Sequence, residues 1–447
     1  MVACMSFPGG ESRAPAPPTS LVLTNRPGTT LVETTSAPGS TTARPTVSDP
    51  ESQSTFIEAT QPTTANIGST VFLAPRARGT GTGASLTDAA DIGRLNEFLS
   101  IVGPGGVVEL AGDAGPYLVT EPLVLSAGGA SGRPVTIRGP QGGARVEFVG
   151  TRADPYDPFD EPGRPLFRLE RGADHLEFAN FDCVRMGNGC FLVVAPITDL
   201  TITGIRAANV RRFFENAAEA ESTATIAGLN ISNVEISGFS KGAIRLAYDT
   251  HDVVISDVVG DSLHYDGDNF AVGVHLLDSV HDVRLERVTM NNARDTLHDY
   301  WNGDGFAAER GVFNLTLTDT SASGNTDAGY DLKASGVRLV NAVAHGNKRN
   351  FRLWGREVIL DSCLGTDPEL RGGAGTQAQL HLAEDAYVEV IGCTFTDSDP
   401  ETIVFDIVDQ SHLVIRTAYV EHSSSARLSA IAPGAAIEFL AIEVLTR

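Results

Sequence analysis

A short segment in which apolar and polar residues alternate recurs along most of this chain, usually directly after Asp, Asn or Gly. Examples are "DHLEFANF", "HDVVISDV", "HDVRLERV", "FNLTLTDT" and "SHLVIRTA". Alternation with a period of two residues is typical of β-strands that have one buried face. The first apolar residues of successive segments are 21 to 32 residues apart, at Leu176, Leu200, Leu229, Val253, Val283, Leu315, Val337, Val358, Val388, Leu413 and Ile437. The pattern therefore predicts a strand-rich protein built from repeated units.

The length of the repeat selects among the known repeat architectures. A strand-containing repeat of this length, with almost no helical pattern, indicates a solenoid. The Leu/Asn consensus of leucine-rich repeats is missing, and a propeller blade needs about 40 residues. Three short strands in each coil, with loops inserted into the longer coils, give an all-β fold. We expect a right-handed parallel β-helix of about 10 to 13 coils, forming one elongated domain from about residue 73 to residue 447.

The first part of the chain has a different composition. Residues 1–72 are rich in Pro, Thr and Ser and have no sustained hydrophobic period, which is typical of a disordered leader or tether. "MVAC" resembles the end of a bacterial lipoprotein signal, in which the Cys after a small residue carries a lipid. Cys4 is thus either a lipid attachment point, if the true start lies upstream, or an ordinary residue of a disordered tail.

One amphipathic segment, "DAADIGRLNEFLSIVGPGG", predicts a helix near residues 88–103. Asp88 or Asp91 would cap its beginning, and Gly103 followed by Pro104 would end it. Such a helix would cover the open end of the solenoid, where unpaired strand edges otherwise invite pairing with another chain.

The formal net charge of −23 argues against nucleic acids and anionic membrane surfaces as partners. No stretch reaches the roughly 18 apolar residues of a membrane span. Five cysteines are too few for a disulfide framework; Cys183 and Cys190, or Cys363 and Cys393, could pair, or all four are single core thiols. We expect a monomer that is secreted, periplasmic or displayed at the cell surface.

Four consecutive coils share a local pattern, which sets their alignment: "DGDNFAVG", "NGDGFAAE", "DAGYDLKA" and "KRNFRLWG". Aligning their aromatic residues stacks Phe270, Phe306, Tyr330 and Phe351 in the interior. Because neighbouring coils are about 4.8 Å apart, the alternate, outward residues then converge on one exterior sheet. These residues are Ala307, Glu309, Asp331, Lys333, Arg352 and Trp354.

This alignment also gathers carboxylates. Asp268 would lie beside Asp304, with Asp327 on the neighbouring turn, and unpaired carboxylates at such distances raise one another's pKa. A hard cation with oxygen ligands, such as Ca²⁺, would neutralise Asp304, Asp327 and Asp331. Alternatively Lys333, on the same face as Asp331, supplies the positive charge without a metal. The residues alone leave both possibilities open.

The successive segments "DGFAAE", "NTDAGYDL" and "GNKRNFRLWG", between Asn302 and Gly355, resemble the motifs of the polysaccharide lyase family 9 pectate lyases. The resemblance implies a β-helix that cleaves a uronic-acid polysaccharide by β-elimination in an outer groove. It also implies that Asp304, Asp327 and Asp331 bind a catalytic Ca²⁺. Arg352 stands where that family has its lysine base.

The chain departs from the family pattern at four positions. Ala328 replaces the second aspartate of a pair, which removes a ligand, and Glu309 replaces a lysine while Lys333 appears one coil later. Arg352 replaces the base lysine; arginine holds its proton up to a pKa above about 12, but its planar fork suits a substrate carboxylate. We expect Arg352 to be the base, with Lys333 and Lys348 as alternatives.

β-Elimination removes the C5 proton, which lies next to a carboxylate, while the C4 glycosidic oxygen leaves. Ca²⁺ or an Arg/Lys clamp would stabilise the developing charge, and a positioned base would take the proton. Lys348, Arg349, Arg352 and Arg356 would form a local positive patch for an acidic polysaccharide within an acidic protein. The remaining residues expected to contact substrate are Trp354, stacked on a sugar ring, and His298, Asp268 and Glu309.

Two other functions compete with this hypothesis. A β-helix glycoside hydrolase would use two or three aspartates around the scissile bond, and Asp268, Asp299 and Asp304 are candidates. A non-catalytic, carbohydrate-binding or surface solenoid would explain Ala328 and Arg352 as marks of a decayed site. In that case Asp331 and Lys333 would form an ordinary surface ion pair.

Overall fold

The computed structural model describes residues 69–159 and 163–447. The chain divides into Met1–Gln61 and Pro62–Arg447, and the fold reported below is that of the second unit. The expected disordered leader, with Cys4, lies outside the described residues, apart from its last few positions: the first strand begins at Thr70. None of the helices in the described part is long and apolar enough to cross a membrane.

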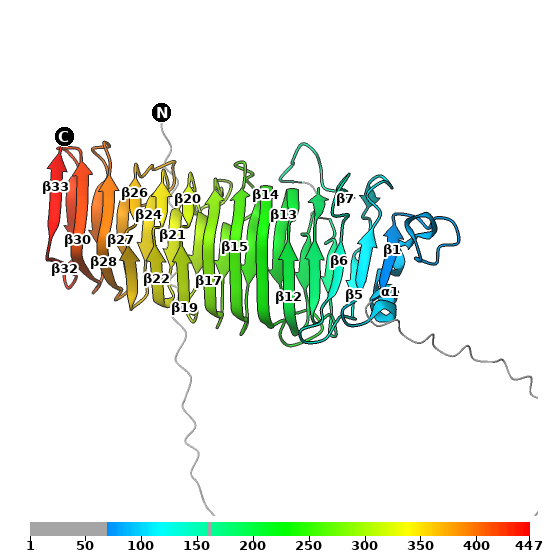
Figure 1. Ribbon diagram of the computed structural model, residues 1–447. Coiled ribbons are helices and arrows are strands. Elements are labelled where there is room, and N and C mark those ends of the chain that lie inside the picture. Colours follow the sequence, from blue (N-terminus) through cyan, green and yellow to red (C-terminus); the bar gives the residue numbers. More distant parts are fainter. Residues whose placement is uncertain (1–68, 160–162) are drawn as a thin grey trace, which may run out of the picture. The chain divides into compact units, whose positions relative to one another are not determined.

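The described residues form a parallel β-helix, as the alternation of the sequence predicts (Figure 1). All strands belong to one continuous 33-stranded sheet, which winds into three faces that we call A, B and C. Strands of each face pair in parallel with those of the preceding and following coils, from β1 near one end of the unit to β33 at the other. The prediction of an all-β, right-handed parallel β-helix is confirmed.

Face A carries most of the segments from which the repeat was recognised. In order of pairing, its strands are β1 (Thr70–Ala74), β3 (Val107–Leu110), β6 (Val135–Arg138), β9 (Leu176–Ala179), β12 (Ile197–Thr203), the start of β14 (Ile226–Leu246), β15 (His251–Asp261), β17 (His281–Asn291), β19 (Phe313–Thr318), β22 (Ser335–Val340), β25 (Val358–Asp361), β28 (Tyr387–Thr396), β30 (His412–His422) and β32 (Ala436–Phe439). The short strand β2 (Ala90–Asp91) pairs with β1.

Face B carries the segments that resemble the lyase motifs. Its strands are β5 (Leu123–Leu125), β8 (Phe167–Leu169), β11 (Phe191–Val193), the end of β13 (Arg206–Asn216), the end of β14, β16 (Ala271–Leu276), β18 (Gly303–Ala308), β21 (Ala328–Leu332), β24 (Arg349–Leu353), β27 (Ala378–Leu382), β29 (Ile403–Ile407) and β31 (Arg427–Ile431).

Face C closes each coil. It is formed by β4 (Tyr117–Leu118), β7 (Val146–Val149), β10 (Phe181–Val184), β20 (Ser321–Ser323), β23 (Val343–His345), β26 (Leu364–Thr366), β33 (Ile442–Thr446) and by parts of the long strands β13, β14, β15, β17, β28 and β30.

The expected capping helix is present but shorter than the sequence pattern suggests. Two 3₁₀ turns, η1 (Leu86–Asp88) and η2 (Ile92–Arg94), precede α1 (Leu95–Val102). Asp91 caps η2 by accepting the backbone N–H of Gly93 at 2.8 Å, rather than starting a continuous α-helix. Leu95, Phe98, Leu99 and Val102 are buried, and Figure 1 places α1 beside β1 and β5, at the first coils of the solenoid. The helix thus covers that end, as expected.

Apolar side chains fill the interior of the coils, and each fully buried aromatic or aliphatic side chain stabilises the fold by roughly 1.5–3 kcal/mol. Cys183 and Cys190 form a disulfide, which is one of the two pairings left open by the sequence. Cys363 and Cys393 are buried free thiols.

The predicted aromatic stack is confirmed at three of its four positions. The rings of Phe306 and Tyr330 are 5.0 Å apart and those of Tyr330 and Phe351 are 5.2 Å apart, with nearly parallel planes. The prediction that Phe270 stacks on Phe306 was wrong. Val274 pairs with Phe306, whereas Phe270 is 54% exposed at the end of a loop. The strand starts only at Ala271, so the loop before it shifts the register by four residues.

Candidate functional site

Polar side chains form an outward row across neighbouring strands of face B. Phe306, Tyr330 and Phe351 point inward, so the residue after each of them points outward. Register partners on successive strands make up this row, which runs Arg245, His275, Ala307, Asp331, Arg352, His381 and Asp406. The row brings together two of the predicted site residues, Asp331 and Arg352, on adjacent strands.

Asp327 is fully buried and lies beside this row at the centre of an ion cluster. Its Oδ1 accepts hydrogen bonds from Arg349 Nη1 at 3.0 Å and is 2.8 Å from Lys348 Nζ. Its Oδ2 accepts from Arg352 Nη1 at 2.9 Å and from the hydroxyl of Tyr300 at 2.7 Å. Burial alone would raise the pKa of Asp327, but Arg352, Lys348 and Arg349 outweigh it and lower that pKa. Asp327 is therefore an ionised carboxylate shared by three cations.

This arrangement does not fit the expected Ca²⁺. Both oxygens of Asp327 are already bonded to cationic or hydroxyl donors, and a divalent ion there would be repelled by the same cations. Asp304, a second expected ligand, uses Oδ1 to accept the backbone N–H of Ala328 at 2.8 Å. Basic side chains thus occupy the place that a metal would take.

Two loops cover the Asp327 cluster. The loop before β18 carries Tyr300 and Trp301, and the loop before β27 contains Gly372 and Gly375. A Cβ on Gly372 would lie 2.1 Å from the ring of Trp301, and one on Gly375 would lie 2.5 Å from Nη2 of Arg349. Both glycines also have a positive φ, of 138° and 100°, a conformation that side-chain-bearing residues rarely adopt, so a substitution at either position would be strained.

Asp304 and Asp331 lie in different electrostatic surroundings, although both are nearly buried. Burial and the negative charges of Asp331 and Asp327 raise the pKa of Asp304 well above its usual range. Asp331 accepts the indole N–H of Trp354 at 2.5 Å and lies 3.5 Å from Lys333 Nζ. A carboxyl group that keeps its proton beside an ion-paired carboxylate is a common basis for acid–base chemistry.

Lys333 and Glu309 form an ion pair at the rim of this group. Lys333 Nζ donates to both carboxylate oxygens of Glu309, at 2.8 and 2.9 Å. The imidazole of His275, 3.8 Å away, and the ammonium of Lys333 lower the pKa of Glu309 to about 2. Burial opposes the charge of Lys333, but Asp331 and Glu309 raise its pKa. Lys333 is consequently held as an ammonium ion, which is unsuited to accept a proton.

Arg352 lies between two carboxylates, those of Asp327 and Asp331. Asp331 and Asp327 raise its pKa against the effect of burial. Its guanidinium stacks over the ring of Trp354, 4.6 Å from the centroid. Its Nη2 has no hydrogen-bond partner among the described residues and, unlike Nε, is not buried. Lys348, the third expected base, is buried in its ion pair with Asp327. Arg352 and Lys333 are therefore held in their protonated forms.

His381 and Asp406 complete the row, and neither was predicted from the sequence as a site residue. His381 Nδ1 lies 2.9 Å from Asp406 Oδ2, which also accepts the hydroxyl of Thr376 at 2.9 Å. The imidazole neighbours Arg352 in register and meets the Trp354 ring edge to face, with centroids 6.3 Å apart. Its Nε2 makes no hydrogen bond within the part of the chain that the structure describes. The alternation in "QLHLA" and "VFDIV" was the signal that could have placed both residues on this row.

Two expected substrate contacts lie away from the row. The side chain of Arg356 is 70% exposed on the turn after β24, 3.8 Å from Asp385. Asp268 binds Arg211 at 3.1 Å and the hydroxyl of Ser240 at 2.6 Å. It does not lie beside Asp304, because Val272 has that position in the observed register.

His298, another expected contact, is tied to a buried carboxylate. Its Nδ1 lies 2.6 Å from Oδ1 of Asp295, whose Oδ2 accepts the backbone N–H of Phe270. Asp299, considered for the hydrolase hypothesis, is exposed on the same loop. Neither residue makes a hydrogen bond to a member of the row among the described residues.

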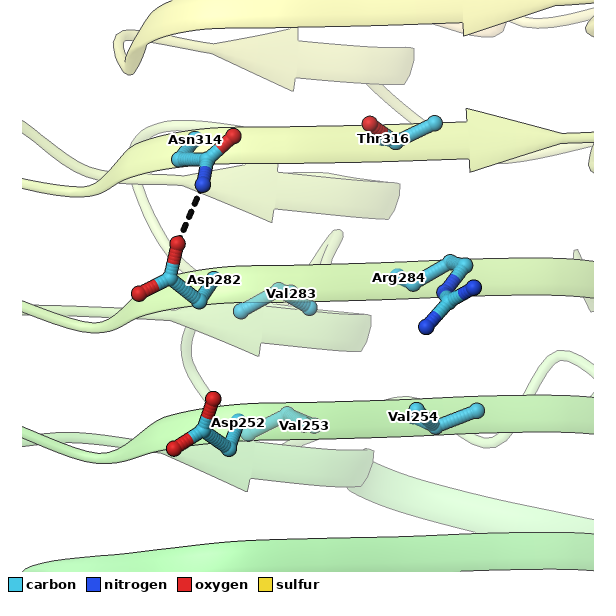
Figure 2. Close-up of a pocket in the computed structure, with 8 residues that line it drawn as sticks. All are labelled: Asp252, Val253, Val254, Asp282, Val283, Arg284, Asn314 and Thr316. Atoms are coloured by element: carbon cyan, nitrogen blue, oxygen red, sulfur yellow. Dashed lines mark hydrogen bonds between the residues drawn. The ribbon is translucent and has the colours of Figure 1, made fainter.

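A hollow of about 510 Å³ lies on face A between β15, β17 and β19 (Figure 2). Figure 2 shows Asn314 bonded to the carboxylate of Asp282, with Asp252 and Arg284 nearby. Its lining contains no imidazole or thiol. The candidate site is therefore the group on face B.

Comparisons with known proteins support the fold. No protein-family model matches the chain, and no curated protein matches its sequence. Among solved structures, it is similar to the GH136 lacto-N-biosidase from Eubacterium ramulus, with 11% identity, a TM-score of 0.52, and coverage of 85% of this chain and 68% of that one.

Two further similar structures are lyases. The pectate lyase Pel9A has 12% identity and a TM-score of 0.42, covering 83% of this chain and 78% of that one. A mannuronic acid specific family 6 polysaccharide lyase from human gut microbiota has 12% identity and a TM-score of 0.44, covering 85% and 91%. At 11% identity, the likeness to the lacto-N-biosidase shows similarity of fold alone.

Proposed function

We propose that this protein cleaves a uronic-acid-containing polysaccharide by β-elimination on face B, without a metal ion. The observation that carries the proposal is the position of His381. Asp406 holds its Nδ1, its Nε2 is unpaired within the described chain, and Arg352 is its register partner on the adjacent strand. A base held next to a cationic clamp is what proton abstraction beside a carboxylate requires.

The reaction uses these two side chains in different roles. The Nη2 of Arg352 binds the uronate carboxylate and stabilises the negative charge that develops on it. His381 Nε2 removes the C5 proton while Asp406 stabilises the imidazolium that forms. The electron pair of the C5–H bond forms the C4–C5 double bond, the C4–O bond breaks, and the leaving oxygen takes a proton from water. Trp354 positions the guanidinium of Arg352 by stacking against it, and its own indole N–H is bonded to Asp331.

The charges of face B favour an acidic polymer over a neutral one. Arg245, Lys333 and Arg352 lie on or beside the row in a protein of net charge −23. Long polysaccharides do not enter cells intact, so a secreted, periplasmic or cell-surface location follows from the proposed substrate. The site is complete within one chain, and we propose that the protein acts as a monomer.

The test is incubation with polygalacturonate and with alginate, following the ultraviolet absorbance of the unsaturated uronate product with and without a chelator. We expect a rise in absorbance that the chelator does not change and that His381→Ala abolishes. Arg352→Ala should abolish it as well, whereas Arg356→Ala, a matched change outside the row, should leave it intact. Full activity of His381→Ala, or loss of activity in chelator, would overturn the proposal.

A glycoside hydrolase is the second candidate, because Asp304 has the raised pKa of a general acid beside the carboxylate of Asp331. Both carboxyl groups are nearly buried, with exposures of 2% and 4%, so substrate would have to displace the groups around them. The same incubations separate the two reactions: hydrolysis raises reducing ends without absorbance, and Asp304→Asn abolishes it. A solenoid that only binds carbohydrate gives neither signal.

A further inference from the structure

A polar hollow also opens on face B, on the strands that precede the candidate site. Its volume is about 210 Å³, and it is lined by the ends of β13 and β14, by β16 and by Phe270. Its polar members are Arg212, Lys241, Arg245 and His275. Arg245 and His275 belong to the same outward row as Asp331 and Arg352. The hollow therefore continues the surface on which the proposed reaction takes place.

Two cations of this hollow have no carboxylate partner among the described residues. Arg245 donates from Nη1 to the backbone oxygen of Asn216 at 2.9 Å, and Lys241 donates to the backbone oxygen of Asn269. Neither forms an ion pair with any described residue, although acidic side chains outnumber basic ones in this protein. Arg212, in contrast, pairs with Glu215 at 2.9 Å.

Keeping these cations together costs free energy. Burial, followed by the positive charge of Arg212, lowers the pKa of Lys241 to about 8. A partly desolvated ammonium beside a guanidinium is stabilised when an anion binds between them. The hollow is thus arranged for a negatively charged group that the protein itself does not supply.

Phe270 adds an apolar surface at the edge of the hollow. It is 54% exposed and has a φ of 56°, a left-handed conformation that is uncommon for a bulky residue. The carboxylate of Asp295, which is fully buried, holds this conformation by accepting the backbone N–H of Phe270 at 2.9 Å. An exposed ring packs well against the apolar face of a sugar.

We propose that this hollow, formed by Arg212, Lys241, Arg245 and Phe270, binds one carboxylate-bearing sugar residue. It is smaller than the roughly 300–1,000 Å³ of pockets for drug-sized ligands, which suits a single monosaccharide unit. Four strand spacings separate Arg245 from Arg352, or about 19 Å at ~4.8 Å each. The assignment of this sugar to the polymer cleaved at Arg352 rests on the proposed function. The binding of the sugar in the hollow is independent of the proposed function.

Titration calorimetry with free galacturonate and glucuronate tests the proposal, with galactose and galactose 6-sulfate for comparison. The His381→Ala protein serves as the background, so that no turnover contributes heat. We expect uronate binding that weakens at least tenfold in Lys241→Met and in Arg245→Met but is retained in Lys241→Arg. Arg284→Met, which removes a cation from face A, should bind uronate as the background protein does.

The outcomes distinguish this inference from the proposed function. Equal binding of galactose and galacturonate, no binding of either uronate, or unchanged binding in Lys241→Met overturns the inference. Preference for galactose 6-sulfate over both uronates overturns the carboxylate specificity in favour of a sulfated sugar. Uronate binding that depends on Lys241, in a wild-type protein that produces no unsaturated product, would support the inference while refuting the lyase proposal.

Discussion

The Oδ2 atom of Asp327 accepts a hydrogen bond from Nη1 of Arg352 at 2.9 Å, across the boundary between a buried ion cluster and the outward row of face B. Asp327 thereby fixes one edge of the guanidinium, while Nη2 remains without a partner among the described residues. The geometry of this clamp requires no metal, because Lys348 and Arg349 bind the other oxygen of Asp327.

Replacing Asp327 with Asn should destabilise the protein strongly. The substitution leaves three cations, two of them almost fully buried, without their shared carboxylate. Removal of one partner from a buried ion pair costs about 3–5 kcal/mol. Chemical denaturation measures the loss, and Asp385→Asn, which breaks the exposed pair with Arg356, should cost less than about 1 kcal/mol. Similar small effects for both variants would contradict the role assigned to the cluster.

Removing calcium should change neither stability nor activity. Both oxygens of Asp327 are occupied by protein donors, and Asp304 bonds to the backbone of Ala328. Thermal unfolding with excess calcium and with excess chelator should therefore give the same Tm. A Tm that rises with calcium and loses that dependence in Asp331→Asn would show that the ion displaces the basic side chains.

Asp406→Asn should slow the reaction less than His381→Ala does. It should act through the imidazole of His381, which Asp406 holds. A positioned general base typically contributes about 10²- to 10⁴-fold to the rate, and we expect the loss in His381→Ala to fall in this range. Asp406→Asn keeps the hydrogen-bonding shape but removes the charge that stabilises the imidazolium, so kcat falls while KM changes little. The rate of formation of unsaturated product over a range of pH checks this. A shifted pH profile indicates positioning of His381, whereas an unchanged profile contradicts it.

The parts of the fold that follow from alternation could be predicted, because burial of every second residue is a local property of the chain. Phe306, Tyr330 and Phe351 stack for that reason, and their outward neighbours Asp331 and Arg352 fall into place with them. The register failed where a loop of variable length precedes the strand, as at Phe270.

The sequence did not predict which groups pair with the buried charged side chains. Two loops, far apart in the chain, cover Asp327 where they meet at Trp301 and Gly372, and one of them supplies Tyr300. No periodic pattern encodes that meeting, so a metal was an equally reasonable partner for the carboxylates. His381, in contrast, followed the same alternation as Arg352 and needed only a longer alignment.

The stability of the protein should fall as pH rises above the range in which an ordinary aspartate titrates, and Asp304→Asn should remove part of that fall. Burial and two neighbouring carboxylates raise the pKa of Asp304 in the folded state, so between its unfolded and folded pKa values the folded protein binds more protons. Protonated Asp304 therefore contributes its full stabilisation at pH values below its pKa in the unfolded chain. This contribution to the free energy of unfolding is lost as the pH rises through its folded pKa, by at most about 1.4 kcal/mol per pH unit. The amide introduced by Asp304→Asn is neutral at every pH and keeps an oxygen acceptor for the N–H of Ala328. Denaturation midpoints measured from pH 4 upward should converge at low pH and diverge in favour of the variant as pH rises; parallel curves would mean that Asp304 is ionised in the folded protein.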